Sequence, residues 1–489
     1  MSENRASSSG ESFAGSVMKY SVATYLGFGI TGAAIIVQGI LGPERIALPA
    51  QFMNTTATLM YLCILGLDQS LLRFYHEPPA GQTGRGLFRA CTGLSAVFTL
   101  ALGAVCSALF ARAIGVFTFG QNYAAVGPGI VPLLFLNAGL YMLVRYLNVL
   151  LRLENNLRAY TAETLWMQAC FNLLYLVPGF FTDNVYFFAL AAVVSFGVTA
   201  IAFWFKAGIA KQTPRPDKQS LATAYRTVVP YGLALAPSQV LIYFNSTVSS
   251  SFLLNYTTPT AQGVYAFCLR VANLVTAIQA GFSTFWGPYV FAHYRQEQER
   301  IGRVHDVLNL LILGFFSVLV MFEDVIFLVF PAYRQGMQVF PLLMLSVVFN
   351  ILCEGTVYGN SIARRPWHDT IGIGVGAAAN LALCAVLVPR LGLPGAAFSV
   401  AAAAGLMFLS RTVTGQYFYR TIPVYSRTAA GFLLAFGVTA AGVLLWQHFV
   451  LKFIVVGCIL FVYCVLYREQ LQKLWRMGLG ILRKLLKKG

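Results

Sequence analysis

Basic residues alternate between long apolar stretches along this chain, and this alternation constrains the fold most. About fourteen apolar stretches, each of about 20 residues or more and so long enough to cross a bilayer, are separated by short polar gaps. Nearly all Arg and Lys residues lie in every second gap. The other gaps hold only Arg45, Arg112, Arg334, Arg390 and Lys452. Because basic residues in short loops stay in the cytoplasm, the pattern predicts an all-α polytopic membrane protein with both termini cytoplasmic.

Composition supports lipid as the main solvent of this chain. Of its 489 residues, 58% are hydrophobic and 10% are charged, which is too apolar for a water-soluble domain. The net charge of +17 then records membrane topology and does not indicate a nucleic-acid partner. The expected spans are residues 19–41, 46–72, 87–113, 123–150, 159–181, 184–206, 223–252, 261–291, 304–330, 335–360, 369–390, 392–416, 428–449 and 450–468.

Two local matches predict that the chain contains an internal repeat. The triplet Pro132-Leu133-Leu134 recurs as Pro341-Leu342-Leu343, and Leu176-Val177-Pro178 recurs at a nearly equal offset as Leu387-Val388-Pro389. Six spans per copy keep both copies in the same orientation, so we expect two six-helix lobes around a central cavity, related by a pseudo-two-fold axis along the membrane normal. The expected segments are a cytoplasmic segment 1–18, an N-lobe 19–206, a cytoplasmic linker 207–222, a C-lobe 223–416, an extra helix pair 428–468 and a C-terminal segment 469–489.

The first and last segments are both cytoplasmic in this interpretation. The segment 1–16 is polar and lacks the pattern of a removable signal peptide. The segment 469–489 combines apolar residues at near-helical spacing with Arg and Lys, which predicts a basic amphipathic helix on the inner leaflet. A frayed basic tail is the alternative.

Metal and cofactor sites are not expected. The nine cysteines all fall in apolar spans without metal-ligand spacing, and the five histidines are scattered over loops and span ends. We therefore expect no cofactor, and leave H⁺ or Na⁺ as candidate coupling ions.

Arg270 is the most informative single residue. It lies in the middle of the eighth predicted span, where an arginine is costly unless it faces a watery cavity or an acidic partner. A guanidinium binds phosphate through several directed hydrogen bonds, which favours a substrate-binding role. A structural ion pair between helices is the alternative.

Arg145 and Glu354 form a second candidate pair. They are separated by the same offset as the two Pro-Leu-Leu triplets, so opposite charges occupy equivalent positions in the two predicted lobes and could form a gate. Glu163 is an equally good partner for Arg145.

Three further carboxylates remain ambiguous. Asp68 and Arg73 are five residues apart, do not share a helix face and should have different partners. Asp68 is a candidate ion-coupling site, although we favour a boundary carboxylate that reaches water. For Glu323 and Asp324 we also favour solvation over cation attraction.

Several aromatic residues, including Tyr265 and Trp286, could stack on sugar rings, but membrane proteins commonly place such residues at interfaces.

Four motifs resemble a known family. The stretches 263–274 (GVYAFCLRVANL) and 282–289 (FSTFWGPY) resemble the eighth-span region of polysaccharide transporters, as does 66–75 (GLDQSLLRFY) at the end of the second span. The segment 393–398 (LPGAAF) matches the start of the twelfth span. Together with the fourteen-span layout, the chain resembles the Wzx-type oligosaccharide flippases of the multidrug, oligosaccharidyl-lipid and polysaccharide exporter (MOP) superfamily.

The resemblance implies a transporter of the bacterial inner membrane that makes and breaks no bonds. Its substrate would be a polyprenyl-diphosphate-linked oligosaccharide, moved from the inner to the outer leaflet, and its partners would include the glycan polymerase and export machinery. Arg270 and Arg145 would then neutralise the diphosphate or acidic sugars. A multidrug or cation exporter and a membrane-embedded glycan polymerase or ligase are the alternatives.

Overall fold

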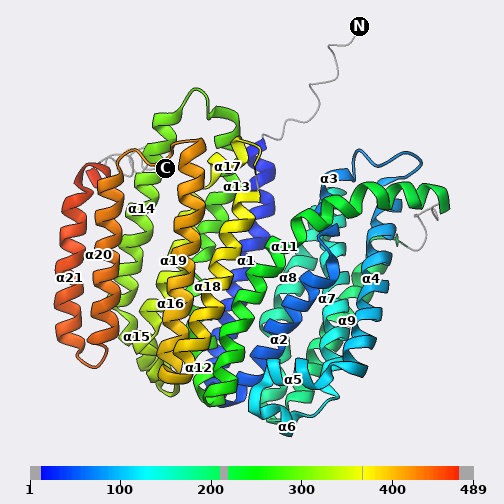
Figure 1. The fold of residues 1–489 in the computed structure, drawn as a ribbon, viewed down its shortest axis with the longest axis horizontal. Coiled ribbons are helices and arrows are strands. Elements are labelled where there is room, and N and C mark those ends of the chain that lie inside the picture. Colours follow the sequence, from blue (N-terminus) through cyan, green and yellow to red (C-terminus); the bar gives the residue numbers. More distant parts are fainter. Residues whose placement is uncertain (1–12, 210–217, 366, 473–489) are drawn as a thin grey trace, which may run out of the picture. The chain divides into compact units, whose positions relative to one another are not determined.

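The protein is helical throughout the part of the chain that its structure, a computed structural model, describes. These are residues 13–209, 218–365 and 367–472, and every regular element within them is an α- or 3-10 helix (Figure 1). Most of the predicted amphipathic segment 469–489 and of the N-terminal segment 1–18, and the centre of the linker 207–222, lie outside the described residues.

The chain forms two compact units. Unit 1 takes in the described parts of Met1–Leu41, Arg45–Thr247 and Ala277–Trp286, and unit 2 those of Gly42–Glu44, Val248–Thr276 and Gly287–Gly489. The elements up to α9 are α1 (Phe13–Leu41), α2 (Pro43–Ile64), α3 (Leu67–Phe74), α4 (Gly84–Leu109), α5 (Ala111–Phe119), η1 (Gly120–Asn122), α6 (Tyr123–Val126), α7 (Ile130–Leu153), α8 (Leu157–Asn172), η2 (Leu174–Phe180) and α9 (Val185–Lys206).

The second half begins with α11 (Lys218–Tyr256), which, like α13, contributes to both units. The remaining elements are α12 (Pro259–Asn273), α13 (Thr276–His293), α14 (Gln298–Met321), α15 (Glu323–Val329), η3 (Pro331–Gln338), α16 (Phe340–Cys353), α17 (Tyr358–Ile362), α18 (Trp367–Leu391), α19 (Leu393–Phe418), α20 (Tyr425–Leu444) and α21 (Phe449–Leu466).

The helices confirm a polytopic membrane protein. Within the described residues, ten helices are long and apolar enough to cross a membrane, or eleven if the bent pair α2–α3 is one span. Every predicted stretch coincides with a helix or a broken helix, although the full count of fourteen spans stays a prediction. Many of these helices expose large apolar side chains, such as Leu100 and Leu109 of α4, which are 72% and 73% exposed. Such surfaces need lipid as their solvent.

The second predicted span is bent by 53° between α2 and α3. Leu65 and Gly66 both have positive φ, 55° and 67°. A Cβ atom built on Gly66 would lie 2.2 Å from the backbone oxygen of Gly232, so only glycine allows this close approach. The bend turns the chain into α3 and thereby places Asp68.

The backbone repeats itself at the offset that separates the two Pro-Leu-Leu triplets. Asn155 and Arg364 are related by this offset, and both have positive φ, 55° and 58°, at the ends of corresponding helices. The Asn156 N–H donates to Leu151 O at 3.0 Å, and the Arg365 N–H donates to Asn360 O at 2.9 Å. The helix breaks after Ile64 and after Asn273 are separated by the same number of residues as the two Pro-Leu-Leu triplets. Equal turns at one offset support an internal repeat.

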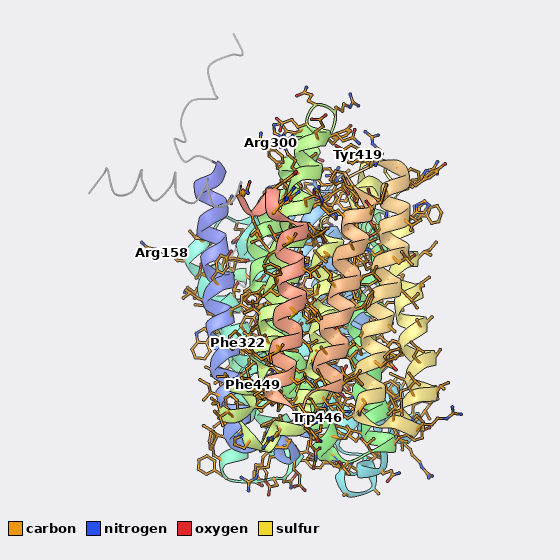
Figure 2. All side chains as sticks on the ribbon, turned by 90° about the vertical axis from the view of Figure 1, so that its left-hand side faces the viewer. Arg158, Arg300, Phe322, Tyr419, Trp446 and Phe449 are labelled. Carbon is orange, nitrogen blue, oxygen red and sulfur yellow. The ribbon has the colours of Figure 1, made fainter. Side chains whose placement is uncertain are left out.

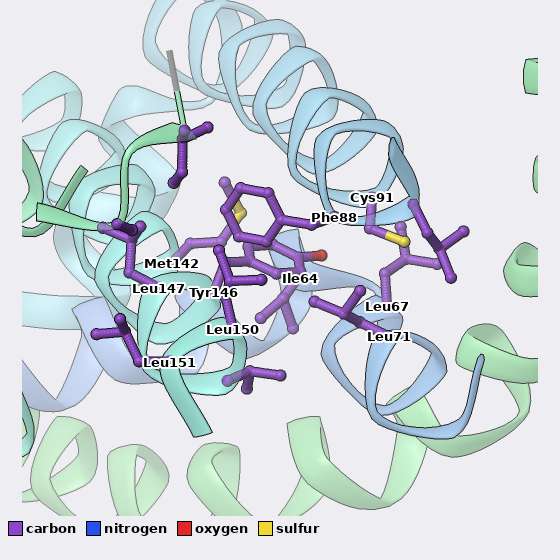
Figure 3. Close-up of a cluster of buried hydrophobic side chains, with 14 of the residues drawn as sticks. Ile64, Leu67, Leu71, Phe88, Cys91, Met142, Tyr146, Leu147, Leu150 and Leu151 are labelled. Carbon is purple, nitrogen blue, oxygen red and sulfur yellow. The ribbon is translucent and has the colours of Figure 1, made fainter. Parts of the chain in front are cut away.

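The core of unit 1 is an apolar cluster near the end of α7. Phe88 and Cys91 of α4 pack there with Tyr146 and Leu150 of α7 and with Ile64 of α2 (Figure 3). All five side chains are fully buried. This cluster fixes α7, and with it the side chains on the adjoining turns of that helix.

Helices α20 and α21 are bound to α14 and α15 of unit 2 by buried charges. Lys452 Nζ lies 2.9 Å from Glu323 Oε1, both side chains are fully buried, and Asp324 also contacts Lys452. The expectation that Glu323 and Asp324 are solvated is therefore wrong for Glu323. It failed because Lys452, 129 residues away in sequence, supplies the opposite charge.

Ion pairing also joins these helices near the other end of α14, where Arg427 Nη1 lies 3.2 Å from Asp306 Oδ2. Arg300 and Tyr419 lie together at one end of unit 2, and Trp446, in the turn between α20 and α21, lies at the opposite end (Figure 2). The polar gaps around Arg300 and Tyr419, both on the predicted inner side, therefore share one end of this unit.

Replacing Gly66 by alanine should destabilise unit 1. The added Cβ meets the Gly232 carbonyl oxygen, and alanine is also strained at positive φ, by roughly 1–2 kcal/mol. Thermal unfolding of the purified protein is the measurement, and we expect a lower midpoint. Gly93→Ala is the matched control, because nothing lies within 4 Å of its added Cβ. Equal midpoints for the two variants would contradict the proposed role of Gly66.

Breaking the Lys452–Glu323 pair should also be costly. Glu323→Gln leaves the buried ammonium with Asp324 alone, so the cost should be below the value of about 3–5 kcal/mol for a buried charge that loses all compensation. We expect a lower unfolding midpoint, and recovery in the uncharged triple variant Glu323→Leu, Asp324→Asn and Lys452→Met. Arg303→Ala, which removes an exposed pair with Glu299, is the control. An unchanged midpoint in Glu323→Gln would show that the pair does not hold α21.

Candidate functional site

A buried ion pair joins α3 and α7 in unit 1. Arg145 Nη2 lies 3.4 Å from Asp68 Oδ2, and the Asp68 side chain is fully buried while that of Arg145 is 27% exposed. Gln69 Nε2 donates a second hydrogen bond to the same oxygen at 3.0 Å. The interpretation of Asp68 as a boundary carboxylate that reaches water is therefore wrong, because the bend at Gly66 turns it into the protein interior.

Tyrosine side chains surround the Arg145 guanidinium. The rings of Tyr61 and Tyr243 stack with centroids 4.0 Å apart, and the Tyr243 hydroxyl donates to the Tyr61 hydroxyl at 3.1 Å. Both hydroxyls, and that of Tyr141, lie within electrostatic range of Arg145. The guanidinium is thus surrounded by aromatic rings and hydroxyl groups. Such an environment suits a polar ligand with an anionic group.

Glu163 is the second carboxylate of this site. It lies in α8, is fully buried and is within electrostatic range of Arg145. Its Oε2 accepts a short hydrogen bond from Asn148 Nδ2, which also donates to Thr164 Oγ1 at 2.9 Å. Arg145 therefore has two carboxylates near it, and its ion pair is with Asp68 rather than Glu163.

The prediction that Asp68 and Arg73 have different partners is confirmed. Arg73 Nη1 lies 3.1 Å from Glu77 Oε2, four residues further along the chain, while Asp68 pairs with Arg145. The gate between Arg145 and Glu354 stays a prediction.

Unit 2 contains a similar arrangement around Arg411. Its Nε lies 3.3 Å from Asp369 Oδ1, and both side chains are 18% exposed. Asn360 Nδ2 donates to the same oxygen at 2.9 Å. Glu354, at the C-terminal end of α16, is within electrostatic range of Arg411. Each unit therefore contains a largely buried arginine, Arg145 or Arg411, with two carboxylates near it.

Arg411 and Asp369 are not singled out by the sequence pattern, because Arg411, near the end of the expected span 392–416, counts among the basic residues of the inner side. The available signal was Asp369 itself, since it is the first carboxylate after the basic pair Arg364-Arg365 and begins an otherwise apolar span. A lone acid at a span end commonly has a basic partner on a neighbouring helix.

Arg270 lies in the last turn of α12 and is partly exposed. Helices α12 and α13 together cover the eighth predicted span, 261–291, with a break between Asn273 and Thr276. The carbonyl end of a helix favours a nearby cation, so the break gives this arginine a stabilising backbone environment that a continuous span would lack.

Tyr265 and Trp286, the two predicted aromatic ligands, are buried, at 1% and 3% exposure. Their ring faces are covered by protein in this conformation. No group of His, Cys, Asp or Glu side chains suited to a metal ion occurs within the described ranges.

Comparisons with known proteins identify the fold. No protein-family model matches the sequence, and no curated protein matches it. Among solved structures, the lipid II flippase MurJ in an inward closed conformation matches 93% of this chain and 100% of its own, at 11% identity and a TM-score of 0.70. An inward-facing multidrug resistance MATE family transporter of the MOP superfamily matches 83% of this chain and 95% of its own, at 15% identity and a TM-score of 0.55. The chain therefore has the helical membrane fold of MOP superfamily transporters.

Proposed function

We propose that this protein is a flippase for a polyprenyl-diphosphate-linked oligosaccharide, such as an O-antigen or exopolysaccharide repeat unit. It moves the sugar head from the inner to the outer leaflet of the bacterial inner membrane by alternating access and catalyses no reaction. Support comes from the fold, which a lipid II flippase shares over nearly the whole chain, and from arginines placed within apolar helices.

The architecture that this function needs follows the sequence predictions. Fourteen spans would form two six-helix lobes around a central cavity, with a further helix pair and both termini in the cytoplasm. The backbone turns that recur at one offset in the two halves support the repeat. A hydrated cavity would remove the desolvation penalty that prevents a charged, hydroxyl-rich head from crossing lipid unaided. The lipid tail would stay in the bilayer.

Arginines are the residues that would recognise the diphosphate. Arg270 is the main candidate, since its partly exposed guanidinium lies beside a helix break. Arg145 is the second, because its side chain is 27% exposed and its partner Asp68 is bound through one oxygen. Tyr265 and Trp286 would contribute only in a conformation that uncovers them. The direction of transport would be set in one of two ways. One is an H⁺ or Na⁺ gradient, with Asp68, Glu163 and Glu354 as candidate coupling groups. The other is removal of the product by a glycan polymerase and export machinery.

One observation favours a drug or cation exporter instead. The surroundings of Arg145 hold two buried carboxylates and one guanidinium, and net negative charge would attract cations. The MATE family transporter that shares this fold belongs to the same superfamily. Uptake of cationic dyes by proteoliposomes separates the two functions, since a lipid-linked oligosaccharide flippase should not accumulate them.

Replacing Arg270 by alanine should abolish glycan export without lowering protein level. Arg270→Lys should restore export only partly, because an ammonium cannot make the paired hydrogen bonds of a guanidinium. The measurements are surface glycan and, by mass spectrometry, the accumulated lipid-linked oligosaccharide, which also identifies the substrate. Arg303→Ala, at an exposed arginine, is the control. Normal export in Arg270→Ala would remove this residue from the mechanism.

Variants at the Arg145–Asp68 pair should separate stability from transport. Asp68→Asn should lower the unfolding midpoint, because the partly buried guanidinium of Arg145 loses its ion-pair partner; the free energy of unfolding should fall by less than the value of about 3–5 kcal/mol for a fully buried pair. Arg145→Met combined with Asp68→Leu should recover stability but not export. If this double variant exports normally, Arg145 is structural and recognises no substrate.

A further inference from the structure

Glu163 is a fully buried carboxylate that forms no ion pair within the described residues. Its side chain is fully buried in α8, where Asn148 Nδ2 donates to Oε2. Oε1 has no hydrogen-bond partner among the described residues. A carboxylate oxygen without a partner costs much more in an apolar interior when it is charged than when it carries a proton.

Arg145 does not neutralise Glu163 fully, because it already pairs with Asp68. Asp68 Oδ1 and Arg145 Nε also lack hydrogen-bond partners among the described residues. Two carboxylates and one guanidinium leave one negative charge in this part of unit 1 when all three groups are ionised. An uncompensated charge in such a place costs several kcal/mol, on the order of the energy of a buried ion pair.

No other cation near Glu163 supplies the missing charge among the residues that the structure describes. From α7 it faces Arg145 and Tyr141, and on α8 itself Cys170 is in electrostatic range. The 3-10 helix η2, which packs on α8, contributes the buried Tyr175.

The two other helices on α8 add no balancing charge among the described side chains. Over the part of α1 whose side chains are described, residues 25–41, the one titratable side chain is the exposed Tyr25. Helix α9 has titratable residues only near its ends, Tyr186 and Lys206, and Lys206 is exposed and lies over the ring of Phe203. Among the described side chains, the groups that face Glu163 are therefore neutral apart from Arg145.

We infer that Glu163 is a proton-binding site, occupied in the conformation described here, in which the proton on the carboxyl group makes the Asp68–Arg145–Glu163 group electrically neutral. A proton fits this site better than Na⁺. Asn148 presents its amide N–H to the carboxylate, and these hydrogens would repel a metal ion, which needs oxygen ligands. Protonation requires no further ligand.

This proton links ion binding to substrate recognition, a consequence that rests on the proposed function. With Glu163 neutral, the charge around Arg145 is one unit more positive than with Glu163 ionised. An anionic group at Arg145 and a proton at Glu163 therefore stabilise each other, and each must raise the affinity for the other by the same factor. Anion binding should weaken as pH rises and Glu163 loses its proton.

Infrared spectroscopy tests the proton site without any substrate. Full-length protein in lipid nanodiscs is titrated with base, and the carbonyl band of a protonated carboxyl group is followed. We expect a band that Glu163→Gln loses and that Glu299→Gln, at an exposed carboxylate, retains. A wild-type band that persists in Glu163→Gln overturns the proposal. A band abolished by Na⁺ at constant pH also overturns it, since the site would then bind a metal cation.

Calorimetry with inorganic pyrophosphate tests the link to Arg145. Uptake of one proton on binding would lower affinity by about tenfold per pH unit once Glu163 ionises. Glu163→Gln should bind pyrophosphate without proton uptake and without this pH dependence. Proton uptake that is unchanged in Glu163→Gln contradicts the link. If pyrophosphate does not bind although the infrared band depends on Glu163, diphosphate recognition at Arg145 fails while the proton site is supported.

Discussion

The cost of placing charge inside a membrane protein governs how these helices are arranged. Lipid gives helices no hydrophobic reason to prefer one neighbour over another, so polar pairs select the neighbours. In unit 1 the guanidinium of Arg145 requires α3 beside α7, and in unit 2 that of Arg411 requires α18 beside α19. Lys452 likewise binds α21 to α15. A few ionised side chains therefore specify contacts that many apolar residues only fill.

Broken helices place the charges that matter most. Asp68 follows the break at Leu65–Gly66. Arg270 precedes the break after Asn273, and this second break lies at the equivalent position of the second half. Breaks leave backbone groups without helical partners, which is tolerated in membranes only where protein or water covers them. Each half thus has a charged side chain next to a helix break, although the backbone has positive φ at Leu65–Gly66 and stays right-handed at Leu274–Val275.

A lipid II flippase and a multidrug resistance transporter have the same fold as this chain. At 11% and 15% identity, a lipid II flippase and a multidrug transporter share helix arrangement with this chain but few side chains. Discrimination between an anionic lipid-linked sugar and a cationic drug must then come from local charge. Two carboxylates around Arg145 favour a cation when ionised, and one proton on Glu163 removes that preference. Under these two proposals, the protonation state of Glu163 would decide whether the surroundings of Arg145 favour an anionic or a cationic ligand.

The sequence by itself determined the helical class, the approximate positions of the spans, the alternation of basic gaps and the offset of the repeat, because these properties can be recognised in the order of residues along the chain. It also indicated that Arg145, Arg270 and Asp68 needed polar surroundings. Only the tertiary structure decided that Arg145 pairs with Asp68, 77 residues away, and that Lys452 pairs with Glu323. Such choices depend on how each helix is rotated about its axis and on where the backbone breaks, and hydropathy contains neither.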